Sequence, residues 1–228
     1  MPKDLKFDGK SLVTGFHGIG ATGYWTIKYL IQHLNTSRVA IIDTDLASPV
    51  TSTIDGKITT PFELFQNNDA VFFKAEVQPI RGSEVKFYRD ICEQIIESGF
   101  KEVVLIGGLD SSLKTDDSKF RLVHTSAYDP KKMFNKTLKL ENDRLIVGPV
   151  ALMLNYFEAV NFPAFAILSY ASAERVDPRA AAAAVEVLSK YFSFQVDLKP
   201  LIQGAEALET ELARTDVAPG RRNESIYT

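Results

Sequence analysis

The segment from Ser11 to Gly23 constrains the fold more than any other part of this sequence. Residues 11–16 form an apolar run that predicts a short buried strand, and Gly18-Ile19-Gly20 predicts a tight turn. Residues 21–34 then have the apolar spacing of a helix. A strand that passes into a helix through so short a turn is typical of α/β domains, in which the helix packs back onto the sheet.

Other apolar segments alternate between strand and helix patterns along the chain. The patterns predict strands at 38–43, 63–66, 70–77, 102–106, 121–125 and 164–170, and helices within 82–99, over about 148–160 and over about 178–191. The continuous apolar run at 39–42 suggests a strand covered on both faces, as in a parallel sheet. We therefore expect a three-layer αβα fold with a mostly parallel or mixed sheet.

Two further segments carry weaker turn and strand signals. Residues 44–61 are polar and rich in turn formers, which predicts a loop or a short irregular hairpin. Residues 137–140 and 144–147 flank Glu141-Asn142-Asp143, so they predict a second hairpin. Asp177-Pro178 predicts the start of an alanine-rich helix, because Asp is a favourable N-cap and Pro suits the first helical position.

The last thirty residues differ in character from the preceding α/β pattern. We expect a core domain over 1–198, a helix over 199–213 and a flexible tail over 214–228. The helix has a narrow apolar seam formed by Leu201, Ala205, Leu208 and Leu212. Docking of this seam on its own domain is favoured over pairing between subunits, because the seam is short.

The glycine turn also matches a dinucleotide-binding fingerprint. Gly18, Gly20 and Gly23 would let backbone amides approach a pyrophosphate, and Asp43, after the next strand, would accept from a ribose hydroxyl. The alternative is a close-packed turn that needs glycine for steric reasons. The bulk of Phe16 and His17 weakens the cofactor interpretation, as does the lack of partners for hydride transfer.

Other catalytic and metal-binding patterns are missing from the sequence. Ser111 or Ser112 could be combined with His124 in a hydrolase triad, but no G-x-S-x-G elbow surrounds either serine, so a turn is favoured. The three histidines lack metal-ligand spacing, and Cys92 is the only cysteine, which argues against a metal site and an internal disulfide. The residues around Cys92 predict a buried structural thiol.

Composition limits the classes of partner. Lys and Arg total 26 and Asp and Glu total 29, so the net charge of −3 lacks the basic footprint of a nucleic-acid binder. The longest apolar run, residues 145–154, is shorter than the roughly 20 residues needed to span a membrane. We expect a soluble, cytoplasmic protein with neither a nucleic-acid nor a membrane partner.

Several short motifs, taken in order, resemble the proteasome assembly chaperone family. The first is the segment Leu12 to Gly20 with Gly23, which is similar to the family's G-F-x-G-I-G-x-x-G opening. It is followed by Val77-Gln78-Pro79, Ile106-Gly107-Gly108-Leu109, Gly148-Pro149 and Asp177-Pro178-Arg179-Ala180-Ala181. The resemblance covers about residues 10–213, and His17 departs from it because members often carry proline there.

The resemblance implies a fold similar to nucleoside phosphorylases, no enzymatic activity and no cofactor. It also implies a homo-oligomer, tetramer or pentamer, and a glycine turn with a structural role. Some members end in a hydrophobic-Tyr-any residue tail that docks between α-subunits of the proteasome core particle, and Ile226, Tyr227 and Thr228 match that tail. The implied function is that of an ATP-independent proteasome assembly chaperone or activator. The alternative is a nucleotide- or dinucleotide-binding enzyme that uses the Gly18–Gly23 turn and Asp43.

Overall fold

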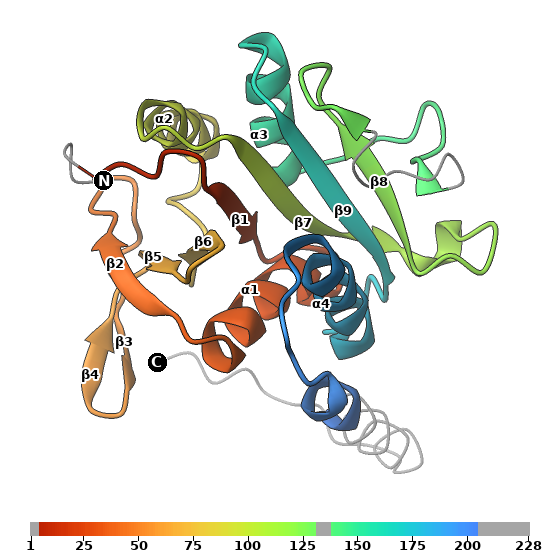
Figure 1. Ribbon diagram of the computed structural model, residues 1–228, viewed down its shortest axis with the longest axis horizontal. Helices are drawn as coiled ribbons and strands as arrows, with labels where there is room; N and C mark the ends of the chain where they lie inside the picture. The colour runs from red at the N-terminus through yellow and green to blue at the C-terminus, as the bar shows by residue number, and fades with distance from the viewer. Residues whose placement is uncertain (1–4, 131–137, 205–228) are drawn as a thin grey trace.

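A seven-stranded mixed sheet forms the centre of the molecule (Figure 1). The structure is a computed structural model, and it describes residues 5–130 and 138–204. Its strand order is β2-β5-β6-β1-β7-β9-β8. The strands are β1 (Ser11–Gly15), β2 (Ser37–Ile41), β5 (Phe62–Gln66), β6 (Ala70–Ala75), β7 (Glu102–Asp110), β8 (Phe120–His124) and β9 (Ala164–Ala171). The four central strands β6, β1, β7 and β9 are parallel, whereas β2, β5 and β8 pair antiparallel with their neighbours.

Two pairs of helices cover the two faces of this sheet. Helices α1 (Thr22–His33) and α4 (Pro178–Phe192) lie on one face, and α2 (Glu84–Glu97) and α3 (Pro149–Ala159) lie on the other (Figure 1). In each central strand, side chains of successive residues point alternately to the two faces of the sheet. In β7, Val103 and Leu105 pack toward α2 and α3, and Val104 and Ile106 pack toward α1 and α4. The predicted three-layer α/β class is confirmed.

The start of α4 follows its predicted signal, and the end of α2 has a glycine of the kind that terminates helices. At the start of α4 the Asp177 carboxylate accepts from the backbone N–H groups of Arg179 and Ala180, both at 3.1 Å. Gly99 follows α2 with φ of +81°, a conformation that glycine adopts without strain. The five alanines of α4 are all buried, which lets the helix lie close to its neighbours.

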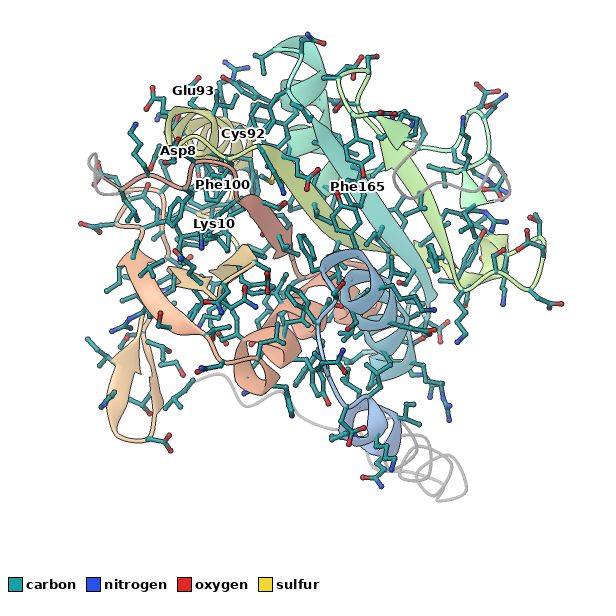
Figure 2. The ribbon with its side chains drawn as sticks, in the orientation of Figure 1. Asp8, Lys10, Cys92, Glu93, Phe100 and Phe165 are labelled. Carbon is teal, nitrogen blue, oxygen red and sulfur yellow. The ribbon has the colours of Figure 1, made fainter. Side chains whose placement is uncertain are left out.

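Cys92 confirms the predicted buried thiol. Figure 2 shows Cys92 on the side of α2 that faces the sheet, with Glu93 on the outer side. Burial raises the pKa of the Cys92 thiol well above its usual value, so the group is a neutral core side chain at physiological pH.

Three strand predictions were wrong in detail. β2 is an edge strand paired antiparallel with β5 and largely exposed, whereas the sequence predicted a strand covered on both faces. Residues 144–147 form no strand, so the second predicted hairpin is absent from the described residues 138–147, where only Lys139 bridges to Leu122. β7 continues through Gly107 and Gly108 to Asp110, four residues beyond its predicted end.

The polar segment 44–61 contains the short hairpin that was one of its two predicted forms. Strands β3 (Ser52–Ile54) and β4 (Lys57–Thr59) pair antiparallel and project from the edge of the molecule (Figure 1). Residues 199–204 are helical, and Leu201 is buried against the α1 and α4 side of the core. The remaining seam residues Ala205, Leu208 and Leu212 lie outside the described residues. No helix in the described ranges is long and apolar enough to cross a membrane.

Candidate functional site

The glycine turn joins β1 to α1 in a very small space. The Ala21 N–H donates to the Gly18 carbonyl at 2.8 Å, and Gly20 has φ of +63°. A Cβ atom on Gly23 would lie 2.5 Å from the Ile106 carbonyl oxygen and 2.6 Å from the Phe16 nitrogen. Gly23 therefore allows α1 to approach β1 and β7 more closely than any other residue could.

The same crowding extends to the neighbouring glycines. A Cβ atom on Gly20 would lie 2.7 Å from the Ala171 Cβ, and one on Gly108 would lie 2.1 Å from the Ile19 carbonyl oxygen. The Gly20 carbonyl also accepts from the Asp177 N–H at 2.9 Å. Gly18 is different, because nothing lies within 4 Å of its added Cβ. Packing against protein thus accounts for Gly20 and Gly23, two of the three fingerprint glycines.

Asp43 does not meet the glycine turn. It is an exposed residue just beyond β2, and strands β5 and β6 lie between β2 and β1 in the sheet. In the dinucleotide fingerprint the acidic residue follows the strand adjacent to the first one. The structure therefore separates Asp43 from Gly18, Gly20 and Gly23, and it does not assemble the ribose contact that the sequence suggested.

The serine and histidine residues considered for a hydrolase triad are also apart. Ser111 and Ser112 lie in a short 3-10 turn, Ser111–Leu113, directly after Asp110, which pairs with Ala171 at one end of β9. His124 pairs with Phe165 at the other end of β9. The expected turn is present, and the triad is not formed. In the described part of the chain, no group of three His, Cys, Asp or Glu side chains could hold a metal ion.

A cavity of about 290 Å³ opens just past the end of β1, beside the last residues of β7, which continues beyond Ile106, the partner of Gly15. The chain leaving β1 forms strands on one side of it, and after β6 it crosses back to form β7 on the other side. This reversal makes the carboxyl ends of β1 and β7 the switch point of the sheet, where open α/β folds bind ligands. Residues 16–19, 106–110 and 145–150 form most of the wall.

The wall of this cavity is largely apolar. Leu145 and Val147 stand at its rim with 88% and 75% of their surface exposed, the two highest values among the large apolar side chains of the described residues. His17 and Asp110 are the only titratable side chains in the wall, and no Lys or Arg lines it within the described ranges.

A buried charge network lies beside the turn and was missed by sequence reasoning. Lys74 contacts Glu63 at 2.9 Å and Glu76 at 3.2 Å, and Tyr24 donates to Glu76 at 2.6 Å. Burial raises the pKa of Glu63, but hydrogen bonds from Lys74, the Thr60 N–H and Arg38 outweigh it and hold the pKa below its usual value. The sequence held one signal for this network: Glu63 and Lys74 are each a charged residue within an apolar strand, and they pair with each other across β5 and β6.

His17 connects this network to the cavity. Its ring stacks on Tyr24 with centroids 3.9 Å apart, and its carbonyl accepts from the Gln78 side chain at 3.1 Å. Burial lowers the pKa of His17, which keeps the imidazole neutral at pH 7. The histidine that departs from the family pattern is therefore an ordered part of the cavity wall.

The partner-binding residues suggested by the sequence, Ile226, Tyr227 and Thr228, lie outside the described residues. The family assignment comes instead from the chain as a whole. The model of the PAC2 family matches residues 12–215. The chain belongs to the PAC2 family. A comparison with curated proteins found no match.

Several solved protein structures are similar in fold to this PAC2 family member. PbaA from Pyrococcus furiosus, described as an archaeal homolog of proteasome-assembly chaperone, matches with a TM-score of 0.77 and 21% identity over 92% of this chain and 89% of that chain. PbaB from the same organism, described as an archaeal proteasome activator, gives 0.74 and 16% over 93% and 95%. A PAC2 family protein from Streptomyces avermitilis gives 0.67 and 18% over 92% and 96%.

Proposed function

We propose that this protein is an ATP-independent proteasome assembly chaperone or activator. The observation that carries the proposal is the PAC2 family match over residues 12–215, supported by the shared fold of PbaA and PbaB. The separation of Asp43 from the glycine turn favours a binding protein over an enzyme that uses a dinucleotide. On this proposal the chain acts in the cytoplasm, without a cofactor.

The proposed contact is made by Ile226, Tyr227 and Thr228, which dock between α-subunits of the proteasome core particle. An apolar side chain beside an amphipathic tyrosine suits a hydrophobic groove with a hydrogen-bonding partner for the tyrosine hydroxyl. Three residues bind weakly, because ordering each one costs about 1–2 kcal/mol. A homo-oligomer, tetramer or pentamer, makes later docking events intramolecular and raises avidity by roughly 10²–10⁴. Docking then needs no ATP, because binding alone supplies the free energy.

Co-sedimentation with the core particle tests this contact. We expect Tyr227→Ala, and removal of residues 226–228, to abolish association with the core particle while the mass of the oligomer stays unchanged. Ser225→Ala is the matched control, because it changes a neighbouring residue outside the docking motif. Undiminished co-sedimentation of the shortened chain would refute the proposed docking.

A separate measurement tests the enzyme alternative. The glycine turn would have to bind a nucleotide or dinucleotide that stabilises the folded chain by mass action. We expect no shift in melting temperature with NAD, NADP or ATP at saturating concentrations. A shift that Gly18→Val removes would favour the alternative. A Cβ atom added at Gly18 would lie in open space, so this substitution does not crowd the core.

A further inference from the structure

The cavity at the switch point has properties that the proposed docking of residues 226–228 does not use. It lies at the carboxyl ends of β1 and β7, where an α/β sheet presents ligands, and its volume of about 290 Å³ is near the lower end of small-molecule sites. The close packing of Gly20, Gly23 and Gly108 leaves the helix α1 side of the turn filled with protein. The open space is therefore on the other side, under residues 145–150.

The charge of the cavity wall selects among ligand classes. Among the described residues of the wall Asp110 is the only carboxylate, and its side chain is held at the end of β7 because it accepts from the Ser112 N–H at 2.8 Å. That hydrogen bond lowers the pKa of Asp110, so the carboxylate is ionised at pH 7. Within the described residues no cation pairs with Asp110, and none lines the cavity.

A phosphate-bearing ligand fits this wall poorly. Its charge would approach the Asp110 carboxylate with no Lys or Arg among the described wall residues to compensate. Neutral His17 adds no positive charge. A protonated nitrogen is favoured for the opposite reason, because it would form a charge-assisted hydrogen bond with Asp110.

The rim supplies the second part of the recognition. Leu145 and Val147 are exposed apolar side chains, and Ile19, Leu109 and Val150 continue the apolar surface inward. An apolar body that enters the cavity would cover part of this surface and gain the free energy of its burial. We propose that the cavity binds a small organic amine, with its apolar body against Leu145, Val147 and Ile19 and its ammonium group on Asp110.

Ligand-observed saturation-transfer NMR on the full chain tests the proposal with three matched probes. These are 2-phenylethylamine, 2-phenylethanol and 3-phenylpropionate, which share an aromatic body and differ in charge. We expect the amine to bind about tenfold more tightly than the alcohol, and the acid to bind most weakly. No saturation transfer to the amine, or equal affinity for the amine and the acid, would overturn the proposal.

Two variants separate the charge from the apolar body. Asp110→Asn keeps the oxygen that accepts from the Ser112 N–H and removes the charge, so amine affinity should fall to that of the alcohol. Glu97→Gln on α2 removes an exposed carboxylate outside the cavity and should change nothing. Retention of the amine preference in Asp110→Asn would contradict the assigned role of Asp110.

The rim is tested with a double substitution at exposed positions, which preserves folding. Leu145→Ser with Val147→Ser should weaken binding of the amine and the alcohol together, by about tenfold. Ile54→Ser with Ile58→Ser, on the β3–β4 hairpin, is the control because it removes two other exposed apolar side chains, 52% and 64% exposed, away from the cavity. If the rim variant instead changes the mass of the oligomer and leaves probe binding intact, the surface is a protein interface and the proposal fails. Core-particle co-sedimentation of the rim variant should be unchanged, so this test is independent of the proposed function.

Discussion

At the scale of single residues, the glycine turn shows that one sequence pattern can satisfy two different demands. Gly23 is required because a Cβ atom there would overlap the Ile106 carbonyl and the Phe16 nitrogen, whereas Gly18 faces open space. A nucleotide fingerprint and a close-packed turn both place glycines at this spacing. Only the surrounding atoms distinguish them, and here protein backbone occupies the space beside Gly23.

This difference predicts opposite outcomes for two alanine substitutions. Gly23→Ala should lower the free energy of unfolding by about 3 kcal/mol or more, because the rigid backbone cannot move away from the new methyl group. Gly18→Ala should change it by about 0.5 kcal/mol or less. Urea unfolding followed by circular dichroism measures both, and similar losses in the two variants would contradict the packing described for Gly23.

The Glu63–Lys74 pair predicts a second contrast between residues. Both side chains are buried, so Lys74→Met should cost about 3–5 kcal/mol by leaving the Glu63 carboxylate without its main partner. Arg38 also contacts Glu63, at 2.6 Å, but its side chain is 42% exposed. Arg38→Met should therefore cost about 1 kcal/mol or less. Equal destabilisation in urea would show that Lys74 has no special role in compensating the buried charge.

At the scale of elements, α4 begins at an N-cap residue, Asp177, that also forms a hydrogen bond with the preceding loop. Asp177 accepts from two N–H groups of the first turn of α4 and from the Ser172 N–H at 3.1 Å. Asp177→Ala should lower the free energy of unfolding by about 1–2 kcal/mol, and Asp177→Asn by less, because its amide oxygen can still cap the helix although its amide nitrogen cannot accept from the Ser172 N–H. Denaturant unfolding of both variants checks this, and equal losses in the two would contradict the main role given to the cap.

The elements also show why part of the structure could be predicted from the sequence. The apolar runs and the caps of α4 and α2 are local signals, so most helices and strands were placed close to their observed positions. The place of β2 in the sheet depends on pairing with β5, which no local pattern specifies. Leu145 and Val147 were assigned to a strand because they are apolar, yet they are exposed, since hydrophobicity alone does not determine burial.

The candidate cavity was less predictable than the fold. Sequence reasoning did not single out Asp110, because glycines at 107 and 108 gave no sign that β7 continues to it. The cavity needs residues from three distant segments, and only the order of the strands shows that those segments meet. The buried pair Glu63 and Lys74 could have been predicted, because each is a charged residue within an apolar run and the two runs were expected to be strands.

At the scale of the whole molecule, the charged core makes stability depend on pH. Hydrogen bonds and nearby cations hold the pKa values of Glu63 and Glu76 below their unfolded value despite burial, which alone would raise them. This stabilisation is complete above about pH 4.5 and is lost as pH falls through the folded pKa values. His17 acts in the same direction from about pH 6.5 downward, because its burial disfavours the protonated form.

We therefore expect the urea midpoint to fall steadily between about pH 6.5 and pH 3. His17→Phe should flatten the upper part of this profile, because it removes the group that titrates there. A series of denaturation curves across this range gives the measurement. A midpoint that rises on acidification would be inconsistent with the network around Lys74.

The position of β1 has a consequence for how the chain is made. β1 leaves the ribosome before the other strands of this sheet, yet its partners are β6 and β7, so that Leu12 pairs with Val71 and Val103. At typical rates of synthesis the second partner emerges about 5–20 s after Leu12. Until β6 is made, this apolar strand of the sheet centre has both of its edges unpaired, and the edge that pairs with β7 stays unpaired for the whole interval. The nascent chain thus passes through a period in which it depends on ribosome-associated factors, or on rapid collapse with α1, to avoid aggregation.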